Sequence, residues 1–127
     1  MEETPGRRFH LILDVVKVEN KKLNNQKFIK DLIKNIARII KMRIILGPKI
    51  IKGSIENPGL TVFSIIDFSH ISIHTFTKHN EFYLDIFSCK PFDEMKVIDY
   101  VKKKFEVSSS QIFIAKPKYI KKKNVSA

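Results

Sequence analysis

The 127-residue chain has one cysteine, no tryptophan and four glycines. A lone cysteine, Cys89, excludes an internal disulfide and a metal site built from several thiolates, so we expect it to act as a thiol. No apolar run approaches the roughly 18 residues that a membrane helix needs. The opening MEETP lacks the apolar core of a secretory signal. We therefore expect a cytoplasmic protein that makes no membrane contact.

Acidic residues are also few, 13 against 24 lysines and arginines, which gives a formal net charge of +11. Most lysines are spread along the chain at helical spacing, as on a solvated helix face, and only residues 116–123 form a dense basic run. We therefore do not expect nucleic-acid binding. The length fits a single domain over residues 1–127, with residues 1–7 and 118–127 expected to be flexible ends.

Apolar spacing predicts two helices and a set of strands. One helix is expected over residues 27–42, with Asn24 or Asn25 as its cap, and the polar stretch before it is read as a turn. The other follows Pro91, with an apolar stripe of Met95, Ile98, Val101 and Phe105. Strands are expected at 8–18, 43–52, 60–67, 69–76, 81–89 and 111–115. This order predicts an α+β fold: a two-layer sandwich with a mostly antiparallel sheet and two helices packed on one face.

The run SHISIHT places polar side chains in a strand where apolar ones are usual. If residues 69–76 and 82–89 pair across a loop at 77–81, Ser69 lies opposite Cys89 and His74 opposite Leu84, with Cβ atoms about 4.5–5.5 Å apart. His74 then lies roughly 16 Å from Ser69, so only a two-fold partner could bring it there. His70 and His74 are about 13 Å apart, too far to share a metal ion, and we expect no metal.

The run SHISIHT followed by LDIFSC, with the spacing of Ser69, His74 and Cys89, resembles the short prokaryotic S-adenosylmethionine decarboxylases. The likeness extends more weakly from FHLILD through the second helix. It implies a pyruvoyl enzyme that cleaves its own chain between Phe68 and Ser69, forms active sites between two protomers and serves polyamine (spermidine) synthesis. In that likeness Ser69 becomes the pyruvoyl group, His74 and Thr61 assist processing, and Cys89 is the proton donor.

The chemistry explains these residue types. An attack of the Ser69 hydroxyl on the Phe68 carbonyl gives an ester that undergoes β-elimination. The resulting dehydroalanine hydrolyses to a pyruvoyl cap on a chain that begins at residue 69. Its ketone forms a Schiff base with a substrate amine and accepts the electrons left by CO2 loss, as pyridoxal phosphate does elsewhere. We therefore expect a covalent pyruvoyl group and neither pyridoxal phosphate nor a metal.

Three positions depart from the family pattern. Phe68 stands where a glutamate is usual, Ile55 replaces an aromatic that stacks on adenine, and Lys78 replaces the acid that holds the ribose. Arginine or ornithine is therefore an alternative substrate, and an uncleaved, non-catalytic paralogue that binds a small molecule or a subunit is another. Because all these substrates are cationic, the acids that could bind them are Glu56, Asp67 and Asp85.

Overall fold

The computed structural model describes residues 7–119. It contains β1 (Phe9–Val15), α1 (Asn20–Leu23), α2 (Gln26–Ile39), β2 (Ile44–Lys52), β3 (Leu60–Ile66), β4 (Ser69–Phe76), β5 (Glu81–Ser88), α3 (Glu94–Phe105), a 3-10 turn (Ser109–Gln111) and β6 (Ile112–Ala115). Most residues of the two ends that were expected to be flexible lie outside this range. None of the helices in residues 7–119 is long and apolar enough to cross a membrane.

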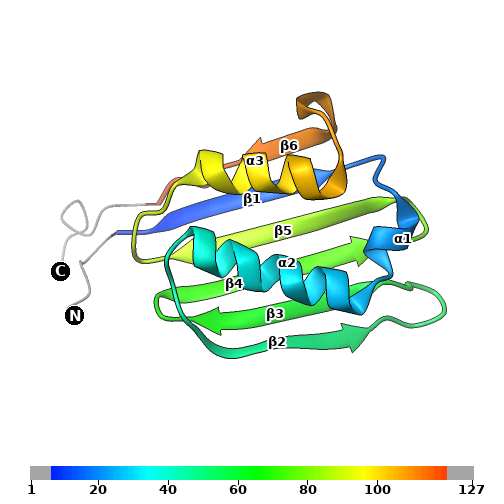
Figure 1. The fold of residues 1–127 in the computed structure, drawn as a ribbon, viewed down its shortest axis with the longest axis horizontal. Helices are drawn as coiled ribbons and strands as arrows, with labels where there is room; N and C mark the ends of the chain where they lie inside the picture. The colour runs from blue at the N-terminus through cyan, green and yellow to red at the C-terminus, as the bar shows by residue number, and fades with distance from the viewer. Residues whose placement is uncertain (1–6, 120–127) are drawn as a thin grey trace.

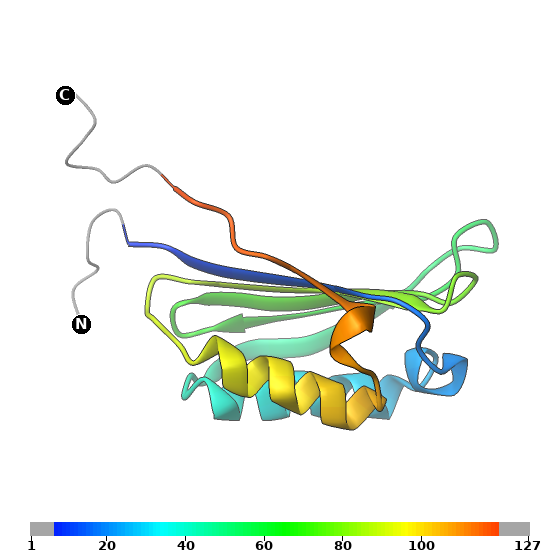
Figure 2. The ribbon, with the colours of Figure 1, turned by 90° about the horizontal axis from the view of Figure 1, so that it is seen from above.

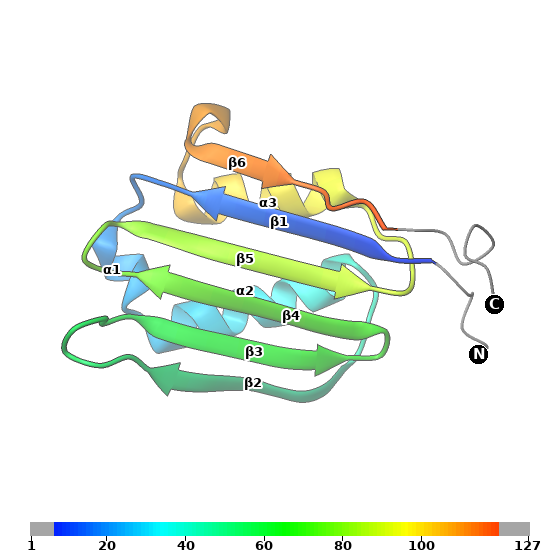
Figure 3. The same cartoon turned by 180° about the vertical axis from the view of Figure 1, so that it is seen from behind.

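Six strands form one sheet in the order β2-β3-β4-β5-β1-β6, and every neighbouring pair is antiparallel (Figure 1). Both long helices lie against the same side of the sheet, as Figure 2 shows edge-on. The sheet is therefore covered on one face, and its other face, turned toward the viewer in Figure 3, carries no helix. The predicted two-layer α+β architecture is confirmed.

Strict alternation in the central strands separates the two faces. In β4 and β5 every second side chain is buried beneath the helices, as with Ile71, Ile73, Phe82 and Leu84. Each such side chain contributes roughly 1.5–3 kcal/mol when it is fully buried. The residues between them point to the uncovered side, which we call the open face. The polar residues of SHISIHT that point there are thus excluded from the core by the pleat itself.

The helices are anchored by caps and by aromatic packing. The Asn25 side chain accepts a hydrogen bond from the Phe28 N–H at 2.9 Å, which confirms Asn25 as the cap of α2. Asp93 caps α3 in the same way, accepting from Lys96 N–H. At the other end of α3, the Phe105 ring stacks on Phe82 of β5 with centroids 4.2 Å apart. The Phe105–Phe82 contact packs the C-terminal end of α3 against β5.

Three details of the fold differ from the sequence-based expectations. Residues 20–23 form the short helix α1 rather than a turn, because the Asn20 side chain binds Thr77 O and Asn80 Oδ1 in the β4–β5 loop. Met95 is 59% exposed and does not belong to the stripe of α3, in which Val97 takes the inward position. The predicted β4–β5 register is also wrong by one residue, since Ser69 pairs with Ser88 and His74 with Tyr83.

The register differs because the β4–β5 loop has four residues, not five. Phe76 pairs with Glu81, and His79 N–H closes the turn onto Phe76 O at 3.0 Å. Asn80, with φ of 56°, adopts the left-handed conformation that lets so short a loop reverse the chain. A one-residue slip exchanges the two faces of a strand, so the loop length decides which side chains of β5 reach the open face.

Candidate active site

The site begins at the two-residue turn between β3 and β4. Ile66 pairs with Ser69, so only Asp67 and Phe68 form the connection. The Asp67 carboxylate accepts hydrogen bonds from the Arg43 N–H at 2.9 Å and from the Arg43 guanidinium at 3.3 and 3.4 Å. These bonds, that from the Arg43 backbone foremost, lower the pKa of Asp67 below its ordinary value. Asp67, considered above as a substrate-binding acid, thus holds the turn to the start of β2.

Cys89 follows β5 directly and reaches this turn through its backbone. Its N–H donates to the Phe68 carbonyl oxygen at 3.1 Å. The register places Ser88, not Cys89, opposite Ser69, and Cys89 is one residue further along the chain. The prediction that Cys89 lies directly opposite Ser69 is therefore wrong, although Cys89 is hydrogen-bonded to the residue before Ser69.

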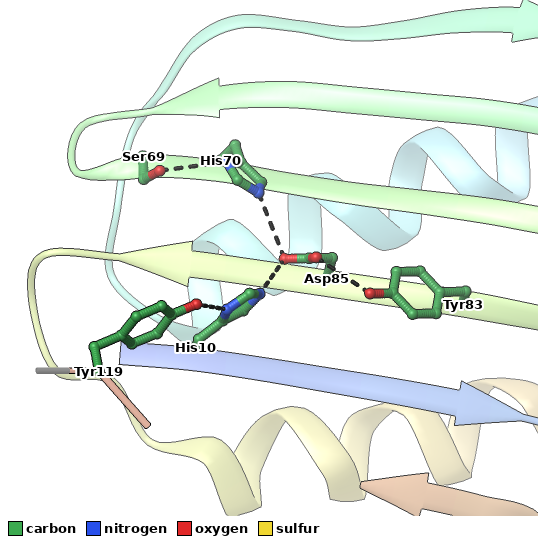
Figure 4. Close-up of polar contacts among 6 residues, drawn as sticks. All are labelled: His10, Ser69, His70, Tyr83, Asp85 and Tyr119. Atoms are coloured by element: carbon green, nitrogen blue, oxygen red, sulfur yellow. Dashed lines mark hydrogen bonds and ion pairs between the residues drawn. The ribbon is translucent and has the colours of Figure 1, made fainter. Parts of the chain in front are cut away.

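Ser69 is half-buried, and its hydroxyl has an imidazole neighbour in the same strand. Ser69 Oγ lies 3.3 Å from Nδ1 of His70 (Figure 4). Ser69 has a φ of 157°, well away from the roughly −140° of an ordinary antiparallel strand. The Phe68 side chain packs against the core, with the Lys90 ammonium 5.3 Å from its ring centroid. The Phe68–Ser69 bond is thus fixed by groups on both sides.

A cluster of polar side chains continues from His70 across the open face (Figure 4). Asp85 Oδ1 lies 3.4 Å from Nε2 of His70 and 2.8 Å from Nε2 of His10. Nδ1 of His10 is 2.5 Å from the Tyr119 hydroxyl, and the Tyr83 hydroxyl donates to Asp85 Oδ2 at 3.4 Å. Burial and the Asp85 carboxylate raise the pKa of Tyr83 and so keep it a donor. The carboxylate thus links two imidazoles, each of which contacts a hydroxyl.

A second polar group lies at the other end of the same strands. Thr61 and His74 are a directly opposed pair of β3 and β4, and Thr61 Oγ1 lies 3.2 Å from His74 Nδ1. His74 does not contact Ser69 of its own chain, because five residues of extended strand separate the two by roughly 16 Å. The structure therefore brings Thr61 and His74 together and keeps both apart from Ser69.

The predicted substrate-binding positions lie in loops at this second end. Ile55, in the β2–β3 loop, is 93% exposed. Lys78, in the β4–β5 loop, donates to the Glu56 carbonyl oxygen at 3.1 Å, so these two positions are in contact. Both loops lie at the end of the sheet opposite to the β3–β4 turn (Figure 3).

Sequence reasoning missed the cluster around Asp85. The sequence pattern names neither His10 nor Tyr83 nor Tyr119 as a site residue. The signal was present, because His10 and His70 both pair with Phe87, on either side of β5, and Asp85 is two residues from Phe87 on the same face. Only the correct register could reveal it. No group of three or more His, Cys, Asp or Glu in residues 7–119 is arranged to hold a metal ion.

Comparisons with known proteins show the family to which the chain belongs. The family model described as S-adenosylmethionine decarboxylase matches residues 9–116. The chain belongs to this family. Among curated relatives, the S-adenosylmethionine decarboxylase proenzyme of Clostridium botulinum (strain Langeland) is 30% identical over 95 residues, covering 74% of this chain and 79% of the relative. The proenzyme of Pyrobaculum arsenaticum is 34% identical over 58 residues, covering 45% and 46%.

The fold of an S-adenosylmethionine decarboxylase is also found in a solved structure. The crystal structure of the adenosylmethionine decarboxylase from Aquifex aeolicus VF5 superposes with a TM-score of 0.72 at 20% identity, covering 90% of this chain and 91% of the other. At that identity the match shows the fold alone, and it agrees with the six-stranded sheet described above.

Proposed function

We propose that this chain is a self-cleaving S-adenosylmethionine decarboxylase whose Ser69 becomes a covalent pyruvoyl group, and that it serves polyamine synthesis. One observation carries the proposal: at the Phe68–Ser69 bond, the nucleophilic hydroxyl touches an imidazole and the carbonyl oxygen accepts a backbone N–H. The curated relatives are named proenzymes, which fits a chain that must be cleaved before it acts.

Cleavage begins when Ser69 Oγ attacks the Phe68 carbonyl carbon. The carbonyl oxygen then becomes an anion, and the Cys89 N–H, already 3.1 Å from that oxygen, is placed to stabilise it. Removing one such donor from an enzyme lowers the rate by about 10²–10³-fold. Only the backbone of residue 68 takes part, so Phe68 in place of the family's glutamate is compatible with cleavage. β-Elimination of the resulting ester then releases the carboxylate of residue 68 and leaves dehydroalanine at position 69. Water hydrolyses the imine form of that residue to the keto group, and its nitrogen leaves as ammonia.

The residues present fit this group. Once formed, the keto group would supply a carbonyl for the substrate amine and an electron sink for the loss of CO2. Cys89 is assigned to return the proton, because its N–H contacts the Phe68 carbonyl oxygen and a thiol can act as a general acid. The Tyr83 and Asp85 side chains lie on the same face and are hydrogen-bonded to each other.

The open face, in this proposal, is covered by a second copy of the chain. Large apolar side chains are exposed on it or at its edge strands: Leu46, Ile51, Ile65 and Phe113. Neither polar group is complete alone, since Ser69 and Cys89 are at one end of the strands and Thr61 and His74 at the other. A two-fold axis through the sheet would place each end over the opposite end of the partner, so that a homodimer forms two shared sites.

Intact mass spectrometry tests the proposal. We expect two fragments, residues 1–68 and 69–127, with the second carrying a keto group in place of the Ser69 amine. The Ser69→Ala variant should remain one chain, and Cys89→Ala, which keeps the backbone N–H, should be cleaved but turn over slowly. Release of CO2 is then compared for S-adenosylmethionine, arginine and ornithine. A whole wild-type chain would contradict the proposal and favour a non-catalytic binding protein, and CO2 from arginine or ornithine alone would reassign the substrate.

A further inference from the structure

His70 is the imidazole that touches the nucleophile within one protomer. Its Nδ1 atom is 3.3 Å from Ser69 Oγ, and its other ring nitrogen, Nε2, is 3.4 Å from the Asp85 carboxylate. A carboxylate accepts but does not donate, so it favours the tautomer of His70 that has its proton on Nε2. Nδ1 is then a bare acceptor, and the Ser69 hydroxyl donates to it. This is the order of groups, hydroxyl to imidazole to carboxylate, by which a serine is activated elsewhere.

The carboxylate is itself held in place. His10 lies 2.8 Å from the same Asp85 oxygen, and the Tyr83 hydroxyl donates to the other oxygen. The side chains of Asp85 and His10 are only 18% and 14% exposed, whereas that of His70 is 41% exposed. Phe87 stacks on the His70 ring with centroids 5.9 Å apart, which fixes the plane of the ring. His70 is thus oriented by its neighbours and still accessible.

We propose that His70 is the catalytic base of self-cleavage and that Asp85 is its positioning residue. The inference rests on the proposed self-cleavage of this chain. The Ser69 hydroxyl gives its proton to Nδ1 of His70 as Oγ bonds to the Phe68 carbonyl carbon. The tetrahedral anion then collapses, the bond from that carbon to the Ser69 nitrogen breaks, and His70 returns the proton to the nitrogen. The products are an ester and a free amine, with no other reactant consumed.

Position separates this role from that of His74. His70 is adjacent to Ser69 in β4 and acts in its own chain, whereas His74 is roughly 16 Å away along the strand and requires the partner. The neighbours of His70 come from three strands. They are Ser69 in β4, Asp85 and Phe87 in β5, and the apolar Ile65 in β3, with which His70 is paired. Among these neighbours Asp85 is the ionisable one, and His10, Tyr83 and Tyr119 act on His70 through it.

The test follows fragment formation in newly made chains, synthesised in a cell-free system and chased over time. His70→Gln should cleave at least about 100-fold more slowly than wild type, the contribution typical of a general base. Asp85→Asn should slow cleavage by about tenfold or more, because an amide no longer fixes the tautomer. The matched control is His79→Gln, the same substitution at an exposed histidine in the β4–β5 loop, and it should cleave at the wild-type rate. Circular dichroism and thermal melting establish that each variant is folded.

Two further measurements distinguish a base from a structural residue. Added imidazole should speed cleavage of a His70→Ala variant and leave Ser69→Ala whole, since the exposed position admits the small molecule. Hydroxylamine splits esters but not amides, so the His70→Gln chain, blocked before the ester, should resist it.

The outcomes are separable. A wild-type chain that never cleaves contradicts the proposed function itself. Wild-type cleavage with an unchanged rate in folded His70→Gln contradicts only the role of His70. Fragmentation of His70→Gln by hydroxylamine would show that the ester forms without His70, and it would also overturn the inference.

Discussion

At the scale of single residues, Asp67 joins the cleavage turn to the chain segment between α2 and β2. Its carboxylate accepts from the backbone and the guanidinium of Arg43, and its own N–H donates to Arg43 O at 3.0 Å. The pKa of Asp67 is lowered, so the folded state prefers the ionised form. Its contribution to stability is therefore present above the unfolded pKa and lost as the pH falls through the lower, folded one.

Asp67→Asn should accordingly lower the melting temperature at pH 7 by no more than a few degrees, since the pair is at the surface. The difference between wild type and variant should shrink as the pH falls below about 4 and on through the lower, folded pKa, because the wild-type carboxylate is then protonated as well. Thermal melts from pH 7 to pH 2 measure it. Asp99→Asn, at an exposed position of α3, is the matched control and should track wild type throughout. A pH-independent difference would assign the effect of Asp67 to its neutral hydrogen bonds.

At the scale of elements, the strands could be predicted closely and their pairing could not. Alternation of polar and apolar residues defines β4 as Ser69–Phe76, because one face is buried and the other is not. The pairing depends on the β4–β5 loop, where Asn80 adopts a left-handed conformation that composition alone does not reveal. Because the predicted register is wrong by one residue, it places Cys89 opposite Ser69 and does not reveal that Asp85 contacts two histidines. The site residues named by resemblance are present, but the network beside Ser69 required the register.

In helix α3 the periodic apolar pattern predicts the buried residues correctly except in the first turn. The stripe predicted from Met95 has the correct residues at Ile98, Val101 and Phe105, and it fails in the first turn, where Val97 is buried and Met95 is exposed. The helix begins at Glu94, capped by Asp93, and the chain enters it from the side of Lys90 and Pro91. Which side chains of the first turn are buried depends on the direction from which the chain enters the helix, and the spacing of apolar residues does not contain that information.

Phe105→Ala should therefore destabilise the fold far more than Met95→Ala. Phe105 is 2% exposed, stacks on Phe82 and meets Phe28 edge-on with centroids 5.3 Å apart, so truncation leaves a cavity between α2, α3 and the sheet. The expected loss is about 3–5 kcal/mol, against about 0.5 kcal/mol or less for Met95→Ala. Chemical denaturation monitored by circular dichroism measures both. Equal losses would contradict the packing described here.

At the scale of the whole molecule, two polar groups lie at opposite ends of the sheet, and each is half of a site in the homodimer proposed above. Ser69, His70 and the Cys89 backbone lie at the β3–β4 turn, and Thr61 with His74 lies near the loops that hold Ile55 and Lys78. A rigid sheet cannot bring its own two ends together. A second copy of the chain that covers the open face, as proposed above, would therefore also complete each site.

Mixing variants tests this arrangement through complementation. Ser69→Ala and His74→Ala chains should each fail to cleave alone, but a mixed dimer has one site in which an intact Ser69 meets the other chain's His74. Coexpression should restore cleavage of the His74→Ala chain and about a quarter of the wild-type sites, since half of randomly paired dimers are mixed and each has one intact site. The matched control is coexpression of Ser69→Ala with His70→Gln, which should restore nothing because His70 serves its own chain. Mass spectrometry identifies which chain is cut, and cleavage of the His74→Ala chain at the same rate with or without its partner would show that the two half-sites do not meet.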